Sequence, residues 1–102
     1  MGVMGGEVLE AGSLKLNMDG CTANRKGHSV KLGTIECQML ATLIRANGTP
    51  VSMDALCQAI WGFANESTVS RLRGVAKRLR AKLRGLRLET IVREGYRLAV
   101  DC

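Results

Sequence analysis

Aromatic residues are scarce in this 102-residue chain, which has one Phe, one Tyr and one Trp. Proteins that bind single-stranded nucleic acid stack bases on several exposed rings, so the composition disfavours that class. The sequence also has no run of about 18 apolar residues, the length that a membrane-spanning helix needs. Residues 1–6 lack the basic region and the apolar block of a signal peptide. We therefore expect a single domain (residues 7–102) after a flexible tail (residues 1–6), with no membrane contact.

Paired metal ligands are missing as well. The four cysteines are widely spaced, no CxxC occurs, and the one histidine is His28. A structural zinc site would need paired Cys or His ligands, so we expect no metal. Cys37 and Cys57 fall among apolar residues of expected helices, which favours buried free thiols. Such cysteine usage indicates a reduced, cytoplasmic protein.

Catalytic constellations are absent too. The sequence contains no paired carboxylates, no Ser–His arrangement and no glycine-rich phosphate loop. An enzyme needs some such set of groups. We therefore predict that the chain is not an enzyme, has no catalytic residue and uses no cofactor.

Acidic residues are scarce in one segment in particular. Ten of the fifteen Lys and Arg residues lie within residues 67–97, where the only acids are Glu89 and Glu94, and the whole chain has a net charge of +6. A surface helix usually mixes both signs and gains from ion pairs three or four residues apart. Here the bases repel one another and need an external anion. This pattern favours double-stranded DNA as the partner.

The periodicity of the apolar residues indicates the order of the elements. Short alternating stretches near residues 8–10, 14–18, 21–24 and 29–32, separated by turn residues, predict an antiparallel sheet. Helical spacing follows from residue 35 to Asn47, and from a cap at Ser52 to Trp61, with Thr49–Pro50 as a linker. A third helix is predicted over residues 67–83 and a hairpin over residues 89–100. The predicted fold class is α+β, a winged helix-turn-helix with an N-terminal four-stranded antiparallel sheet, three helices and a C-terminal β-hairpin wing.

The third helix has two distinct faces. Val69, Leu72, Ala76, Leu79 and Leu83 form one apolar stripe, which we expect to be buried. The opposite face begins with small residues and ends with long cations, in the order Ser67, Ser70, Gly74, Lys77, Arg78 and Ala81, with Arg71, Arg80, Lys82 and Arg84 on its flanks. A glycine inside a helix costs about 1 kcal/mol relative to alanine. Gly74 therefore indicates either close approach to DNA or a crowded helix contact within the protein.

Four motifs in order resemble one family. They are Leu32-Gly33-Thr34-Ile35-Glu36, Val51-Ser52-Met53-Asp54-Ala55-Leu56 followed by Ile60-Trp61-Gly62, Arg78-Leu79-Arg80-Ala81-Lys82-Leu83, and Gly95-Tyr96-Arg97-Leu98. Over residues 9–100 the chain is similar to the OmpR/PhoB-type winged-helix DNA-binding domains of bacterial response regulators. No phospho-acceptor receiver domain is present in the sequence, so we expect either an excised domain or a stand-alone regulator.

The chain departs from the family pattern at three places. Gly33 replaces the usual Thr and weakens the cap of the first helix. Arg73 stands where the family has an acid, so the base preference of the family is not carried over to this chain. The wing arginine of the family falls at either Val92 or Arg93.

The resemblance implies a sequence-specific transcription regulator whose third helix enters the major groove. Its wing would meet the adjacent backbone or minor groove. The residues expected to contact DNA are Ser67, Ser70, Arg71, Gly74, Lys77, Arg78, Arg80, Arg84, Arg93 and Arg97. The protein would act as a monomer or weak dimer on DNA. The alternative is a winged helix that binds protein and modulates RNA polymerase or another regulator.

Four further side chains carry separate expectations. The resemblance makes Phe63 and Glu66 candidate contacts for RNA polymerase, whereas Phe63 could instead pack into the domain's own core. We expect Glu36 to be buried beside a base of the third helix. The Tyr96 ring is expected to pack on that helix, with its hydroxyl pointing outward.

Overall fold

The computed structural model describes residues 8–92 and 94–99. Its N-terminal half begins with a four-stranded antiparallel sheet, formed by β1 (Val8–Ala11), β2 (Leu14–Asn17), β3 (Thr22–Arg25) and β4 (His28–Lys31) in sequence order. Alternation along β2 buries Leu14 and Leu16 and exposes Lys15 and Asn17. One face of the sheet can therefore pack on the helices while the other faces solvent. The predicted sheet is confirmed, and the predicted tail, residues 1–6, lies outside the described residues.

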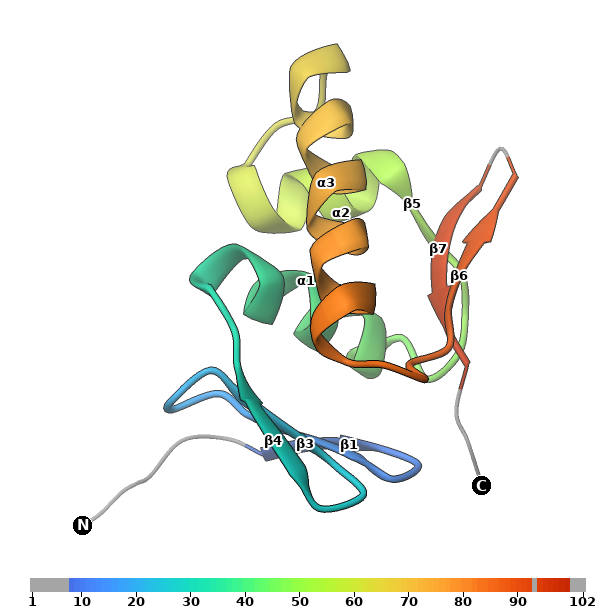
Figure 1. The fold of residues 1–102 in the computed structure, drawn as a ribbon. Coiled ribbons are helices and arrows are strands. Elements are labelled where there is room, and N and C mark those ends of the chain that lie inside the picture. Colours follow the sequence, from blue (N-terminus) through green and yellow to red (C-terminus); the bar gives the residue numbers. More distant parts are fainter. Residues whose placement is uncertain (1–7, 93, 100–102) are drawn as a thin grey trace, which may run out of the picture.

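Three helices pack above this sheet (Figure 1). They are α1 (Thr34–Arg45), α2 (Met53–Trp61) and α3 (Glu66–Lys82). Ser52 caps α2 as predicted, because its Oγ accepts the Ala55 N–H at 3.0 Å. Gly62 ends α2 with φ of 86°, a left-handed conformation that favours glycine.

The start of α3 differs by one residue from the prediction. Asn65 precedes the helix, and its Oδ1 accepts the Thr68 N–H at 2.9 Å. In return, Thr68 Oγ1 accepts the Asn65 N–H at 2.8 Å. This reciprocal cap satisfies two backbone donors and makes Glu66, not Ser67, the first helical residue.

The wing is a hairpin of β6 (Leu88–Ile91) and β7 (Gly95–Leu98). It carries a third strand that the sequence did not indicate. β5 (Val51–Ser52) pairs with β7 through Val51 opposite Tyr96 and Ser52 opposite Gly95. The segment before α2 is therefore not only a linker and a cap. It attaches the wing to the beginning of α2.

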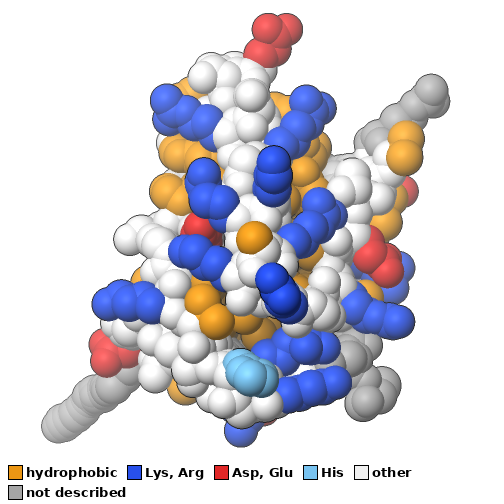
Figure 2. Space-filling model, in the orientation of Figure 1, with side chains coloured by type: hydrophobic (Ala, Val, Ile, Leu, Met, Phe, Trp, Pro, Cys, Tyr) orange, Lys and Arg blue, Asp and Glu red, His pale blue; other side chains and the backbone are white. Residues whose placement is uncertain are grey.

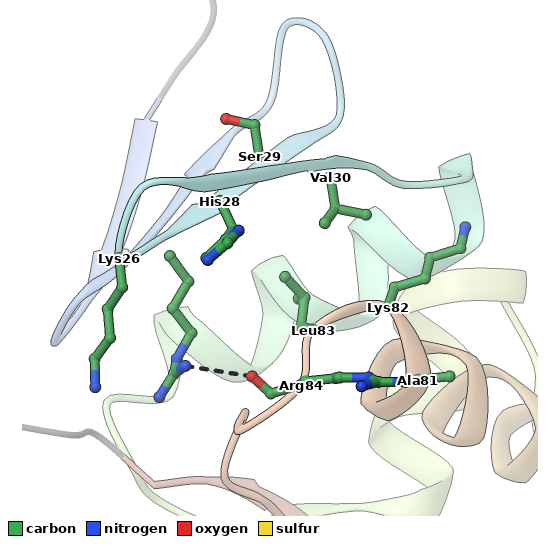
Figure 3. Close-up of a pocket in the computed structure, with 9 residues that line it drawn as sticks. Lys26, His28, Ser29, Val30, Ala81, Lys82, Leu83 and Arg84 are labelled. Atoms are coloured by element: carbon green, nitrogen blue, oxygen red, sulfur yellow. Dashed lines mark hydrogen bonds between the residues drawn. The ribbon is translucent and has the colours of Figure 1, made fainter.

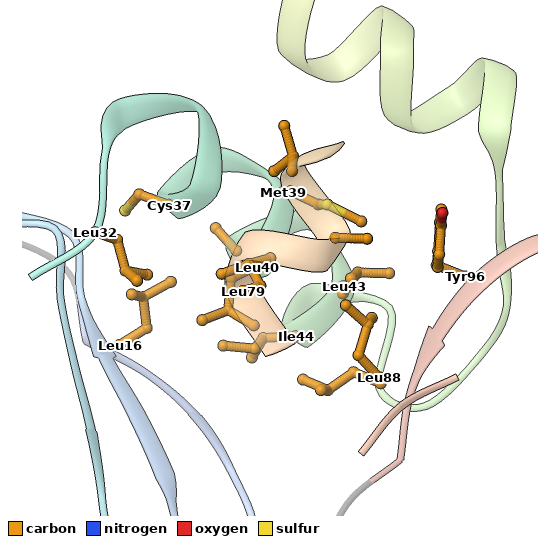
Figure 4. Close-up of a cluster of buried hydrophobic side chains, with 14 of the residues drawn as sticks. Leu16, Leu32, Cys37, Met39, Leu40, Leu43, Ile44, Leu79, Leu88 and Tyr96 are labelled. Carbon is orange, nitrogen blue, oxygen red and sulfur yellow. The ribbon is translucent and has the colours of Figure 1, made fainter. Parts of the chain in front are cut away.

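The core lies between the sheet, the helices and the wing (Figure 4). Most of the predicted stripe of α3 is confirmed as buried, since Leu72, Ala76, Leu79 and Leu83 are between 0% and 4% exposed. Val69 is only half-buried, while Thr68 and Val75 are buried although the predicted stripe omitted them. The buried surface of α3 is therefore wider than five residues, which suits a helix packed between α1, α2 and the wing.

The buried thiols are confirmed for Cys37 and Cys57. Burial and the neighbouring Cys21 thiol raise the pKa of Cys37 to about 12, so this thiol stays protonated at neutral pH. Its Sγ lies 3.9 Å from the sulfur of Met18, which places β2's end against the first turn of α1. No helix in residues 8–92 and 94–99 is long and apolar enough to cross a membrane.

Candidate nucleic-acid interface

One face of α3 carries nearly all of the helix's exposed cations. Figure 2 shows Lys and Arg side chains on both sides of a paler strip along the helix. We call this surface the basic face. It comprises the exposed side chains of Arg71, Arg73, Lys77, Arg78, Arg80, Lys82 and Arg84. Among the described residues, its ion pairs involve a single acid, Glu36. The repulsion predicted from the sequence is therefore largely uncompensated within the described part of the chain.

Small residues form the strip between these cations. Ser67 and Ser70 are exposed. A Cβ atom built at Gly74 would meet only the Nη1 atom of Arg78, at 3.9 Å, so no crowded contact inside the protein explains this glycine. The surface around residue 74 is open enough for another molecule to approach the helix backbone. A crowded contact with the described residues is therefore excluded as the reason for Gly74, and close approach to DNA stays a prediction.

Glu36 organises the inner edge of the basic face. Its side chain is 5% exposed and lies on the first turn of α1. Oε1 accepts the Lys82 ammonium at 2.7 Å and the backbone N–H of Gly33 at 2.9 Å, and Oε2 accepts the Nε–H of Arg78 at 3.2 Å. The predicted pairing of Glu36 with an arginine of the third helix is confirmed. Lys82 is a second cation on the same carboxylate.

These contacts decide the charge state of Glu36. Burial alone would raise the pKa of this carboxyl. The Lys82 and Gly33 hydrogen bonds, with the positive charges of Lys82 and Arg78, outweigh burial and lower its pKa below the ordinary value. Glu36 is thus a buried anion at neutral pH. It also supplies the helix cap that Gly33 cannot provide with a side chain of its own.

The same contact orients Arg78. Only its Nε is used by Glu36, and 60% of the side chain remains exposed. The two terminal NH₂ groups therefore keep their donors, and Nη1 lies beside Gly74 at the strip. An arginine in this state can form a bidentate contact with a guanine edge or a phosphate.

Arg80 makes contacts within the protein. Its Nε and Nη2 donate to the Leu88 carbonyl oxygen at 3.1 and 2.7 Å, and Nη2 also donates to Thr90 Oγ1 at 3.0 Å. Its guanidinium carbon lies 5.9 Å from the centre of the Tyr96 ring, which is 4% exposed. Arg80 therefore joins α3 to the wing. Its predicted contact with DNA stays a prediction, and its position now favours a role in fixing the wing.

The remaining wing residues are only partly described. Arg97 lies opposite Glu89 in the β6–β7 ladder, with Nη1 at 3.7 Å from Oε1. Val92 at the wing tip is 80% exposed. Arg93 lies outside the described residues, so its predicted DNA contact has no structural account here.

The connector between α2 and α3 presents an apolar ring. Phe63 is 54% exposed, and Glu66 after it is exposed too. The alternative in which Phe63 packs into the core is wrong. Trp61, by contrast, is half-buried and packs against the core.

Three features of this surface were missed by sequence reasoning. They are the attachment of the wing by β5, the turn of Arg80 toward the wing, and the use of Lys82 as a partner of Glu36. The pairing of Lys82 with Glu36 could have been predicted from the sequence, since Arg78 and Lys82 are four residues apart and lie on one side of a helix. Within residues 8–92 and 94–99, no three His, Cys, Asp or Glu side chains gather as ligands for a metal ion.

A three-helix domain with a basic third helix and a C-terminal wing defines the winged helix-turn-helix class of proteins. Residues 27–98 match the family model described as "Transcriptional regulatory protein, C terminal", and the chain belongs to this family. Its fold and family are thus the ones that the four sequence motifs predicted. The family is one of regulatory domains and not of enzymes, in agreement with the sequence.

Several relatives and structures are similar to this chain. The transcriptional regulatory protein CseB of Streptomyces coelicolor is 34% identical over 95 residues, which are 91% of this chain and 40% of that protein. RpaA of Synechocystis, described as a DNA-binding dual master transcriptional regulator, is 29% identical over 100 residues, which are 93% of this chain and 42% of that protein. The chain thus spans about two fifths of the length of these relatives.

Solved structures extend the comparison. The DNA-binding domain of CpxR from E. coli superposes with a TM-score of 0.81 at 24% identity, covering 94% of this chain and 99% of that one, which shows the fold. The DNA-binding domain of RstA from Klebsiella pneumoniae, solved in complex with the RstA box, gives a TM-score of 0.79 at 26% identity. That match covers 91% of this chain and 97% of the RstA chain.

The Glu36 contacts predict how stability changes with acid. Because the pKa of Glu36 is lowered by folding, the unfolded chain binds more protons near the ordinary carboxyl value of 4.5, and stability falls as the pH drops through the folded-state pKa. Glu36→Gln should cost about 1–3 kcal/mol at pH 7 by leaving the cations unpaired. The free energy of unfolding of the Glu36→Gln variant, measured with urea, should also fall less between pH 5 and pH 3 than that of the natural protein. Glu10→Gln, at an exposed residue of β1, is the control. Equal pH dependence in the Glu36 variant and the natural protein would contradict this assignment.

Proposed function

We propose that this chain is the DNA-binding part of a bacterial transcription regulator and binds duplex DNA with sequence specificity. In this proposal α3 enters the major groove, and the wing meets the adjacent backbone or minor groove. The observation that carries it is the basic face, an acid-poor set of exposed cations beside a strip of small residues. The RstA domain, which has a similar fold and was solved in complex with the RstA box, supports DNA binding by this chain. A protein that reads a bacterial genome acts in the cytoplasm, which is where we place it.

The dimensions of α3 suit this role. Its 17 residues make a helix of about 25 Å. The major groove of B-DNA is about 12 Å wide and admits one α-helix. Ser67, Ser70 and Gly74 would let the backbone of α3 approach the groove floor, while Arg71 and Lys77 would reach the phosphates on the groove walls.

The cations of the basic face differ in their hydrogen-bond and ion-pair partners within the protein. Arg78 is oriented by the buried Glu36, and a side chain with one preferred direction is suited to read a base edge. The side chains of Arg71, Lys77 and Arg84 have no hydrogen-bond or ion-pair partner among the described residues. Flexible cations of this kind suit phosphates, which need charge more than geometry. We assign Arg80 and Arg97 to support of the wing, with contact to DNA as a secondary role.

We expect binding to be specific for duplex DNA and to weaken strongly with salt. If about five phosphates are neutralised, the log–log slope should be about −4 to −5, and affinity should fall about 10²–10³-fold from 50 to 200 mM salt. A mobility-shift titration of genomic fragments at these two salt concentrations measures both quantities. An affinity that does not change with salt would contradict DNA binding and favour the alternative of an apolar protein interface.

Substitution of Arg78 should reduce sequence specificity, whereas substitution of Arg84 should reduce affinity for every DNA sequence. Arg78→Ala should cost about 1–3 kcal/mol at the preferred site and less on random DNA, because a base contact is lost. Arg84→Ala should weaken binding to both DNAs about equally, because only phosphate contact is lost. Affinities for the selected site and for random duplex, measured side by side, give the comparison. Equal losses on both DNAs for both variants would rule out this division of roles.

Gly74 should affect binding more than folding. Gly74→Ala should stabilise the domain by up to about 1 kcal/mol, since the new methyl group fits at ordinary contact distance from Arg78. Gly74→Gln or Gly74→Leu should fold but bind DNA weakly, because the larger side chain fills the strip and displaces the Arg78 guanidinium. Thermal midpoint and DNA affinity are measured for each variant. Unfolding of the larger variants, or normal DNA affinity in them, would show that α3 does not insert at this residue.

The exposure of Phe63 favours a second contact, with RNA polymerase. An aromatic ring that is 54% exposed on a connector, beside the acid Glu66, is typical of a protein-binding anchor. In this proposal the protein binds DNA as a monomer or weak dimer and presents the connector to the polymerase. The contact is added to DNA binding and does not replace it.

Phe63→Ser should therefore leave DNA affinity unchanged and weaken polymerase recruitment. We expect at least about a fivefold loss in the affinity of RNA polymerase for the protein–DNA complex, which corresponds to about 1 kcal/mol. Val8→Ser changes an apolar residue of similar exposure, 51%, in β1 and should have no such effect. Unchanged polymerase affinity in the Phe63 variant would rule out the connector as the contact.

A further inference from the structure

Three sulfur atoms meet where the β2–β3 turn packs on the first turn of α1. Met18 and Cys21 are the first and last residues of that turn, because Asn17 and Thr22 form the last pair of the β2–β3 ladder. The Cys37 thiol donates to the Met18 sulfur at 3.9 Å and also has a side-chain hydrogen bond with Cys21. Figure 4 shows Cys37 at the end of the core nearest the sheet. One thioether and two thiols from separate elements thus form a group, which we call the sulfur cluster.

The backbone of Cys21 is unusual for a residue with a side chain. Its φ is 51°, in the left-handed region that L-residues other than glycine, asparagine and aspartate seldom adopt. This conformation costs such a residue roughly 1–2 kcal/mol. Packing does not account for a cysteine here, because the side chain is only half-buried. A thiol kept at this cost points to a role for its sulfur.

The two elements that carry the sulfurs are fixed relative to each other. The Leu32 N–H donates to the Cys21 carbonyl oxygen at 2.7 Å, which holds the turn beside the start of α1. At the opposite end of β3, Arg25 Nη1 donates to the Arg84 carbonyl oxygen at 3.3 Å. Figure 3 shows His28 pointing from β4 toward this end of α3. The sheet is therefore attached to the helices at both ends of β3, and the sulfur cluster lies between rigid elements.

The spacing of the sulfurs suits a soft metal ion. Two sulfur ligands that lie about 2.3 Å from a metal, with the angle of about 120° of a trigonal site, are about 4 Å apart. The Cys37 and Met18 sulfurs, at 3.9 Å, match this separation. An ion can enter from the side of the turn, since Met18 and Cys21 are half-buried whereas Cys37 is 1% exposed.

The kind of ligand favours one metal. Thiolate and thioether sulfurs suit Cu(I), whereas a structural Zn²⁺ site is closed by four ligands. Over residues 8–92 and 94–99, no further His, Cys, Asp or Glu joins the two cysteines to make a group of three. The sequence predicted no metal because it has no paired Cys or His spacing. The fold nevertheless brings together two cysteines that are far apart in the chain.

We propose that Met18, Cys21 and Cys37 form a binding site for Cu(I). The two cysteines would bind as thiolates, each releasing its proton, and the Met18 thioether would complete a three-coordinate site. The bound ion would join the β2–β3 turn to the first turn of α1, next to Glu36. This proposal is independent of the proposed function, because neither the site nor its test involves DNA.

The site is tested by competition for Cu(I) with a coloured Cu(I) chelator, with oxygen excluded. Cys102 lies outside the described residues and is replaced by serine in every protein used, so that its thiol cannot contribute. We expect this parent chain to withdraw one equivalent of Cu(I) from the chelator. Cys21→Ser and Cys37→Ser should each weaken Cu(I) binding at least about tenfold, or about 1.4 kcal/mol. Cys57→Ser removes a buried thiol of α2 outside the cluster and should change the affinity less than about twofold.

A third variant keeps the test decisive if Cys37→Ser does not fold. Met18→Leu removes the sulfur at nearly constant side-chain volume and should weaken Cu(I) binding at least about threefold. Cu(I) should also raise the Tm of the Cys57→Ser variant more than that of the Cys21→Ser variant, because the ion stabilises only a chain that binds it. Equal Cu(I) affinity in the Cys21, Cys37 and Cys57 variants overturns the proposal. Failure of the parent chain to take Cu(I) from the chelator overturns it as well.

Discussion

The basic surface of this domain depends on one buried carboxylate. Glu36 is 5% exposed and bridges the first turn of α1 to two cations of α3. It caps the helix that Gly33 begins, holds α1 against α3 and sets the direction of Arg78. Because the anion is buried and the side chains of Arg78 and Lys82 are 60% and 37% exposed, the cluster presents positive charge outward. A buried charge with one partner removed is costly, so the cluster also makes this arrangement specific.

The wing is held to the same unit by two separate contacts. Arg80 joins α3 to the backbone of β6 and lies over the Tyr96 ring, and β5 joins β7 to the beginning of α2. α3 and the wing are therefore presented at a fixed relative position before any partner arrives. Preorganisation of this kind lowers the entropy lost on binding. Arg80, which the sequence predicted as a DNA contact, is part of this support, and its contact with DNA stays a prediction.

Sequence patterns predicted most of the fold, because the spacing of apolar residues follows which side chains are buried. Alternation along β2 and the helical spacing of Leu72, Leu79 and Leu83 reflect burial directly. The expected burial of Glu36 beside a base of the third helix is also confirmed. β5 was not predictable, since two residues carry no period. The direction of Arg80 depends on how closely the wing approaches α3. The contact of the β3–β4 hairpin with the end of α3 joins residues 59 positions apart, Arg25 and Arg84, which no local pattern encodes.

The close packing of the wing at Gly95 limits which of its residues can be substituted. A side chain at this residue would overlap the Val51 carbonyl oxygen and crowd Ser52, so the junction between the wing and α2 admits no Cβ atom. Val92 and Glu94, at the tip of the same hairpin, are exposed and meet no such limit. Mutations can therefore accumulate at the tip and alter what it touches without loosening its attachment. The tip of the wing can thus change its side chains, whereas residue 95 at the junction with β5 accepts only glycine without a shift of the backbone.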